Sequence, residues 1–138
     1  MNPTKETSSL SYLNATGHIP YGMTNDYMFR LILEKNNYVL KGLICSLLSL
    51  TPEKIISVEI QNPILLNETV KDKEFILDIK VLMNDSAIIN LEMQMAYMLN
   101  WRERSLSYLC RAFDQLSHGQ LYDNVKPAIH IGFLNFNP

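Results

Sequence analysis

Apolar residues in the first third of the chain recur every three or four positions, which is the spacing of one face of an α-helix. The run MFRLIL follows the capping sequence TND and predicts a helix over about 24–35. An Asn-Asn pair interrupts that pattern, and a second helix with a wide apolar face is predicted over 38–49. A Thr-Pro pair at 51–52 predicts one short helical turn after it.

Beyond that turn the period of the apolar positions changes to two, the period of a half-buried β-strand. Four strands are predicted in this part of the chain: 56–60, 75–83, 87–95 and 127–136. The polar stretch 67–74 reads as a loop, and an amphipathic helix is predicted from 101 to about 120, with Gly119 as its stop. The order α-α-β-β-β-α-β predicts an α/β (α+β) fold in which helices flank a central mixed sheet.

Two stripes run along the helix predicted over 101–120. The apolar stripe is predicted to be core and consists of Leu106, Leu109, Cys110, Phe113 and Leu116. The polar stripe is either a solvated face or the border of a cleft, and it consists of Arg104, Tyr108, Arg111, Gln115 and His118. His130, in the last predicted strand, is interpreted as a core histidine with satisfied hydrogen bonds.

The composition places the chain among globular domains. With 47% hydrophobic and 19% charged residues in a length of 138, the chain is not disordered and has room for one domain. Residues 1–20 are polar and are predicted to form an N-terminal arm, which leaves 21–138 as the domain. No apolar run approaches the roughly 18–20 residues of a membrane span, and the N-terminus lacks the apolar region of a secretory signal.

Cysteine usage and charge bear on the compartment and the partner. Cys45 and Cys110 lie in apolar helical patterns and are predicted to be reduced core thiols of a cytoplasmic protein. The formal net charge of -2 provides no global basic field. A nucleic-acid partner would therefore be held by a local basic patch or by protein outside this chain.

The second and third predicted strands form a hairpin, and the length of its loop decides which faces of the two strands match. A two-residue loop at 84–85 would set Asp78 against Leu91 and bury a charge among apolar side chains. A three-residue loop at 84–86 matches the apolar faces of both strands and sets Asp78 opposite Glu92. The three-residue loop is therefore predicted.

In that register two carboxylates stand side by side, with Cβ atoms about 4.5–5.5 Å apart. Like charges at this distance repel each other, and nothing in the hairpin itself requires them. A divalent cation between Asp78 and Glu92 would remove the conflict, and oxygen ligands completed by water suit Mg²⁺ or Mn²⁺. The alternative is that both acids only decorate a solvated face, because acid pairs on exposed hairpins are common.

Four segments carry a resemblance to a known family: TNDYMF at 24–29, ILDIKV at 76–81, INLEMQ at 89–94, and the stretch from RSLSYLC to the final strand, 104–136. Together they resemble the PD-(D/E)XK nuclease superfamily, and within it the transposase-like, recombination-promoting (Rpn) branch. The resemblance implies a restriction-endonuclease-like core and a magnesium-dependent endonuclease that hydrolyses phosphodiester bonds of DNA. Members of the branch usually continue past the last strand, so it also implies a core without its C-terminal portion.

By this resemblance, Asp78 and Glu92 are the metal ligands, and Gln94 completes the catalytic set where the superfamily usually has Lys. A Gln amide can orient the attacking water but cannot accept its proton at neutral pH. The proton would pass to metal-bound hydroxide, to solvent or to the substrate phosphate.

The resemblance favours the cleft-border interpretation of the polar stripe, in which Arg104 or Arg111 contacts a phosphate and Gln115 hydrogen-bonds near the metal. Asp26 is either a helix cap or, by the resemblance, an acid that approaches the metal through water. Lys80 shares the face of Asp78 and pairs either with a carboxylate or phosphate of the site or in a surface ion pair.

Three hypotheses for the function follow. The first is a divalent-metal-dependent DNA endonuclease. The second is a degenerate, non-catalytic nuclease-fold module that forms a homodimer or docks on DNA, and the third is a structural domain whose acidic pair has no role. The presence of both Asp78 and Glu92 favours the first, whereas Gln94 and the low basicity favour the second.

Overall fold

The computed structural model describes residues 16–18, 22–62, 78–114 and 116–138. Its main elements follow one another as α1 (Asp26–Lys35), α2 (Asn37–Leu48), β1 (Val58–Ile60), β2 (Ile79–Met83), β3 (Ala87–Gln94), α3 (Trp101–Phe113) and β4 (Ala128–Leu134). Two short 3₁₀ helices lie at Pro52–Lys54 and Tyr122–Asn124. The predicted order of elements is thus confirmed. The predicted loop 67–74 and nearly all of the predicted arm lie outside the described residues.

Two asparagines set the starts of the first two helices. Asn25 precedes α1, and its side-chain oxygen accepts a hydrogen bond from the backbone N–H of Met28 at 3.0 Å. Asn36 ends α1 and begins α2, and its side chain accepts from the N–H groups of Tyr38 and Val39. The capping oxygens satisfy amides that have no partner inside the helix, so the chain turns sharply between the two helices at this point.

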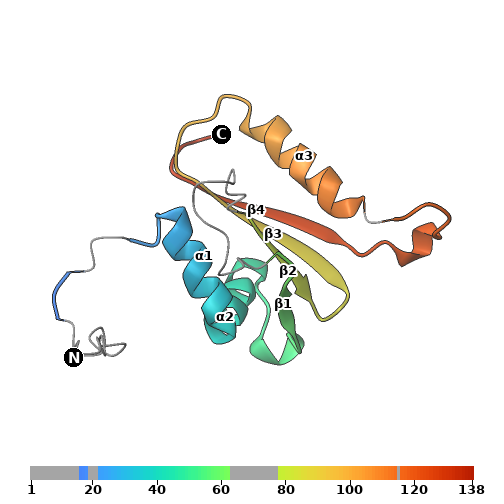
Figure 1. Cartoon of the computed structure of the whole chain (residues 1–138), viewed down its shortest axis with the longest axis horizontal. Helices are drawn as coiled ribbons and strands as arrows, with labels where there is room; N and C mark the ends of the chain where they lie inside the picture. The colour runs from blue at the N-terminus through green and yellow to red at the C-terminus, as the bar shows by residue number, and fades with distance from the viewer. Residues whose placement is uncertain (1–15, 19–21, 63–77, 115) are drawn as a thin grey trace, which may run out of the picture.

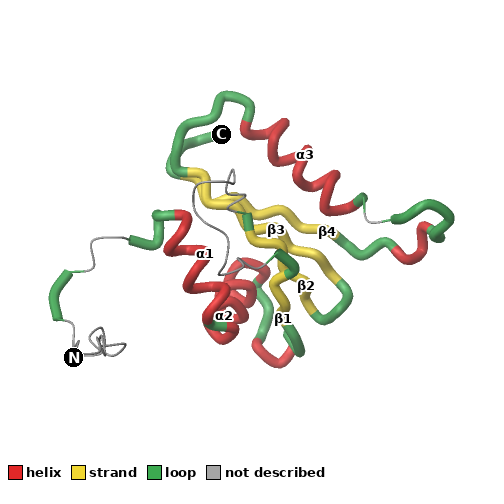
Figure 2. The backbone as a smooth tube through the Cα atoms, viewed as in Figure 1, coloured by secondary structure: helices red, strands yellow, loops and turns green. Residues whose placement is uncertain are grey.

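The four strands form one mixed sheet in the order β1-β2-β3-β4. The pairs β1–β2 and β2–β3 are antiparallel, and β3–β4 is parallel. Parallel neighbours need a crossover connection, which α3 supplies. In Figure 1 α3 lies on one side of the sheet, and α1 and α2 lie on the other. Figure 2 shows the same layers as a tube coloured by secondary structure.

The hydrophobic core lies between the sheet and the first two helices. Alternate residues of β2 and β3 that point to this side are fully buried: Ile79, Val81, Ile89 and Leu91. They pack with the apolar faces of α1 and α2, including Phe29, Leu33, Leu40 and Ile44. This side of the sheet is called the apolar face below. Among the described residues, no helix combines the length and apolar character that crossing a membrane requires.

The register of the β2–β3 hairpin is the one predicted from the sequence. Met83 pairs with Ala87 across a three-residue loop, and Ile79 pairs with Leu91. Asn84 and Asp85 in that loop have positive φ angles of 52° and 50°, a conformation that these two residue types tolerate better than most. The predicted strand residues 75–77 lie outside the described part of the chain.

Strand β1 is shorter than predicted. The sequence pattern included Ile56, but the strand begins at Val58, and Ile56 is 87% exposed. The cause is Asn84, whose side-chain oxygen accepts from the N–H groups of both Ile56 and Ser57 and thereby takes the place of a strand partner. Ile55, one residue earlier, is buried instead.

Helix α3 differs from its prediction in length and in the face that it buries. It ends at Phe113, not near residue 120, and Gly119 with its φ of 87° lies in a later turn. The predicted apolar core stripe is wrong for much of its length: Leu106 is 60% and Phe113 56% exposed. Cys110 is exposed as well, so only Cys45 of the two free thiols is a core thiol.

The reason is the character of the sheet beneath α3. On this side β3 and β4 carry Asn90, Glu92 and His130, so the helix places polar and aromatic side chains against them. Trp101, the first residue of α3, is buried over Gly132 of β4. A Cβ atom on Gly132 would lie 2.3 Å from the Trp101 ring, so the bare backbone of this glycine allows the helix to approach.

Candidate functional site

The side of the sheet under α3, called the polar face here, carries the candidate site. Along β3 it presents Asn90 and Glu92, whose partners on β4 are His130 and Gly132. Asp78 immediately precedes β2, and the observed β2–β3 register, continued by one position, sets it opposite Glu92. The strand alternation that buries Ile79 and Leu91 on one face therefore turns these acids to the other.

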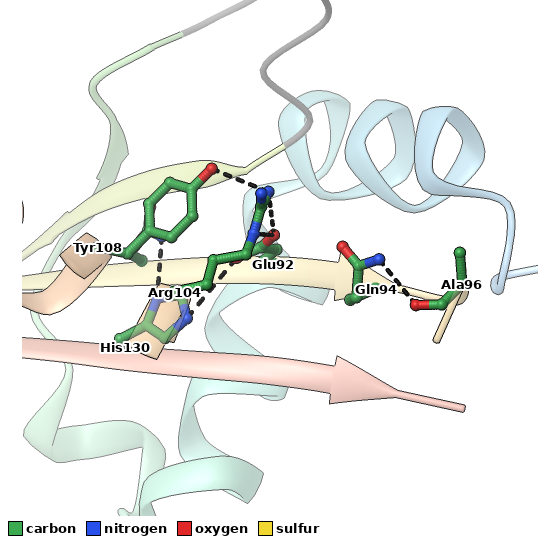
Figure 3. A network of polar contacts seen from close by, with 7 residues as sticks. Glu92, Gln94, Ala96, Arg104, Tyr108 and His130 are labelled. Atoms are coloured by element: carbon green, nitrogen blue, oxygen red, sulfur yellow. Dashed lines mark hydrogen bonds and ion pairs between the residues drawn. The ribbon is translucent and has the colours of Figure 1, made fainter. Parts of the chain in front are cut away.

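Glu92 is a buried carboxylate, 5% exposed, and its partner comes from α3. One of its oxygens, Oε1, accepts hydrogen bonds from Nε and Nη2 of Arg104 at 3.1 and 2.9 Å. Nη2 of Arg104 also donates to the Tyr108 hydroxyl at 3.0 Å, one helical turn further along (Figure 3). Arg104 thus neutralises Glu92 and links it to the helix.

His130 lies beside Glu92 and forms the floor under Tyr108. The two rings stack with centroids 5.5 Å apart and planes 4° from parallel. Nδ1 lies 3.1 Å from Nδ2 of Asn90, and Nε2 lies 3.7 Å from Oε2 of Glu92. With the Asn90 amide donating to Nδ1, a neutral imidazole carries its proton on Nε2, toward Glu92. Burial lowers the pKa of His130 below its usual value, which favours this neutral form.

Three buried polar atoms on this face have no hydrogen-bond partner within the described residues: Oδ1 of Asp78, Oε2 of Glu92 and Nε2 of His130. Burial raises the pKa of the Asp78 carboxyl, against the opposing charges of Arg30, His130 and Arg104. A buried oxygen that lacks a partner costs about 1–3 kcal/mol. The two carboxylate oxygens are therefore the atoms of this face most suited to accept a bound cation or water.

None of the other predicted site residues that the structure describes forms a hydrogen bond or ion pair with Glu92, although Lys80 pairs with Asn90 across the β2–β3 ladder and so faces the same side of the sheet. Gln94 lies further along β3, and its Nε2 donates to the carbonyl of Ala96 at 2.9 Å (Figure 3). Asp26 stands in the first turn of α1, and neither its side chain nor that of Lys80 joins the hydrogen bonds described for this part of the chain. Arg111 is exposed, with its guanidinium 6.0 Å from the Tyr108 ring centre. Gln115 lies outside the described residues.

His130 and Asn90 belong to the polar face although the sequence pattern does not identify them as site residues. The sequence interprets His130 as a core histidine with satisfied hydrogen bonds, yet its Nε2 has no hydrogen-bond partner within the described residues, and it lies 3.7 Å from Oε2 of Glu92. A signal for it exists, because a lone histidine interrupts an otherwise apolar strand. That signal becomes informative only with the β3–β4 register, which pairs Asn90 with His130 across a parallel ladder. Two strands separated by a helix do not reveal their register in the sequence.

Comparison with known proteins gives a family match. Residues 23–138 match the model of a family described as PD-(D/E)XK nuclease family transposase. No curated protein and no solved structure matches the chain significantly. The matched range includes every element of the sheet and all of the polar face.

Proposed function

This chain belongs to the PD-(D/E)XK nuclease family of transposases, and from that membership we propose that it is a divalent-metal-dependent endonuclease acting on DNA in a transposase-like or recombination-promoting role. One observation carries the proposal. Asp78, just before β2, and Glu92 on β3 face the same side of the sheet, and each has a buried oxygen without a hydrogen-bond partner among the described residues.

The donor atoms of the site fit Mg²⁺ or Mn²⁺, because carboxylate oxygens are the protein ligands that these ions prefer. Within the described residues no three His, Cys, Asp or Glu side chains are grouped to hold a metal ion. The proposed site therefore has two protein ligands, Asp78 and Glu92, and the remaining positions fall to water and substrate phosphate. A cation held there would stabilise the charge that develops on the phosphate and make a bound water more acidic.

The chain's own residues have separable roles in this proposal. Arg104, which forms an ion pair with Glu92, would pair with a phosphate oxygen when a cation occupies the carboxylates. Gln94 can only orient water, because its amide cannot accept a proton, and to do so it must leave the carbonyl of Ala96. Arg111, which is exposed and lies on α3 as Arg104 does, would extend the positive charge toward the DNA backbone.

A second candidate function is a non-catalytic nuclease-fold module that docks on DNA or on a second copy of the chain. The ion pair between Arg104 and Glu92 favours it, because Glu92 is already neutralised without a metal. Gln94 at the position of the usual Lys favours it too. The two candidates differ in one measurable property, which is the binding of a divalent cation by Asp78 and Glu92.

The test is titration calorimetry with Mn²⁺ and Mg²⁺, together with cleavage of supercoiled plasmid. Wild-type protein should bind the ion, and Asp78→Ala and Glu92→Ala should each abolish both binding and cleavage. Glu59→Ala is the matched control, since Glu59 is an exposed acid on β1, on the same side of the sheet. Folded wild-type protein that binds neither ion would refute the nuclease and leave the docking module. Equal cleavage by wild type and Asp78→Ala would reveal a contaminating nuclease.

A further inference from the structure

Arg30, in the middle of α1, is a charged residue inside the core. It is only 3% exposed, and a buried guanidinium is costly unless its donors are used. Nη1 donates to the backbone carbonyl of Asp78 at 2.6 Å, and Nη2 donates to the backbone carbonyl of Asn62. Its Nε lies 3.6 Å from the carboxylate of Glu34, one turn further along the helix. The guanidinium thus joins the end of β1 to the start of β2.

Asn62 makes the same connection with its side chain. Its Nδ2 donates to the carbonyl of Asp78 at 2.9 Å, and its Oδ1 accepts from the N–H of Lys80 at 2.8 Å. Both are backbone groups at the point where the β1–β2 ladder ends. The ladder ends with the bond from the N–H of Gln61 to the carbonyl of Lys80, so the amide of Asn62 extends it by one step.

Asp78 depends on these bonds because it stands outside the regular strand. Strand β2 begins at Ile79, so the backbone of Asp78 lies just outside the strand pairing that holds the residues after it. Its carbonyl instead receives one hydrogen bond from Arg30 and one from Asn62.

We propose that Arg30 and Asn62 are positioning residues for Asp78: by clamping its backbone carbonyl from α1 and from the end of β1, they hold its carboxylate opposite Glu92 for the cation. The inference rests on the proposed function, because it concerns the same metal site. Partners that orient a metal ligand typically change metal affinity by about 10–100-fold when removed. An arginine that only filled the core would have no such effect.

The test compares two asparagines whose side chains form hydrogen bonds to backbone groups at opposite ends of the β1–β2 pair. Asn62→Ala removes the bonds to Asp78 and Lys80. Asn84→Gly is the matched control, because Asn84 also binds three backbone groups through its side chain, near the hairpin loop. Glycine accommodates its positive φ without strain. Mn²⁺ affinity is measured by calorimetry and by the Mn²⁺ EPR spectrum, and thermal stability is measured separately for each protein.

Both variants should lose stability, but only Asn62→Ala should lose Mn²⁺ affinity, by about 10–100-fold. Arg30→Lys keeps the charge with fewer donors and should bind Mn²⁺ more weakly than wild type but better than Arg30→Met. Asn62→Ala that binds Mn²⁺ as wild type does would overturn the inference and leave the nuclease proposal intact. Wild-type protein that binds no Mn²⁺ would overturn both.

Discussion

The two faces of the sheet come from the same strands, yet they hold their neighbours by different forces. On the apolar face, Ile79, Val81, Ile89 and Leu91 are fully buried against α1 and α2. Each such side chain contributes roughly 1.5–3 kcal/mol through loss of contact with water, whatever apolar group it meets. On the polar face, Glu92 depends on the particular donors of Arg104 at 3.1 and 2.9 Å.

The difference teaches where stability and chemistry reside. The apolar face needs only volume and hydrophobicity, so it stabilises the fold. The polar face retains buried atoms without hydrogen-bond partners in the described residues, each of which lowers stability by about 1–3 kcal/mol. A face that keeps such a cost is suited to a ligand, and the packed apolar face behind it holds the strand that carries Glu92.

The largest expected effect is on the free energy of unfolding, and it differs between two adjacent residues of β3, one on each face of the sheet. Ile89→Ala should lower the free energy of unfolding by about 2–5 kcal/mol, because it opens a cavity against α1 and α2. Asn90→Ala should cost less, about 1–3 kcal/mol, the loss expected when the buried Nδ1 of His130 is left without its partner. Urea denaturation measures both values, and equal losses would contradict the division between the faces.

Gly132→Ala should disturb only the polar face. The added Cβ would lie 2.3 Å from the Trp101 ring, so α3 must shift, at a cost of about 1–3 kcal/mol. Trp101 is the single tryptophan of the chain, and its fluorescence should move to longer wavelength as the ring becomes more exposed. Gly42→Ala is the control: among the described residues, nothing outside the adjoining stretch of its own helix lies within 4 Å of the added Cβ, and alanine in a helix should stabilise α2 by about 0.5–1 kcal/mol. An unshifted spectrum for Gly132→Ala would show that α3 does not depend on this contact.

The same comparison explains how far the sequence could predict the structure. The alternation of apolar residues predicted the order of elements and the hairpin register, because burying Ile79 and Leu91 together requires it. The face that α3 buries could not be predicted in this way, because an apolar stripe is normally the inner one and here the sheet beneath is polar. Asp78 and Glu92 were predicted as a pair from one hairpin. The roles of Arg30 and His130 depend on contacts with elements far apart in the sequence, which local patterns do not encode.

A smaller effect is expected from Asp78→Asn in metal-free protein, and its sign depends on pH. Burial raises the pKa of Asp78 above its ordinary value of 3.8, so the folded state holds the proton more tightly than the unfolded state. The stability from this group is fully present below pH 3.8 and is lost as the pH rises through the folded-state pKa. Asparagine resembles the protonated form, so Asp78→Asn should melt at a higher temperature than wild type at pH 7.5, and the gain should shrink toward pH 3. A gain that does not vary with pH would exclude ionisation of Asp78 as its cause.

The smallest effect is expected on the outer face of α3, where the sequence predicted core. Leu106 is 60% exposed, so Leu106→Gln should change the free energy of unfolding by no more than about 0.5 kcal/mol. Leu33→Gln is the matched substitution on the apolar face, where the side chain is 1% exposed, and it should cost several times more because a buried amide loses its water without gaining partners. Chemical denaturation of both variants decides the point. If Leu106→Gln destabilised the protein as much as Leu33→Gln does, the outer stripe of α3 would be buried in solution, and the orientation that brings Arg104 and Tyr108 onto the polar face would be wrong.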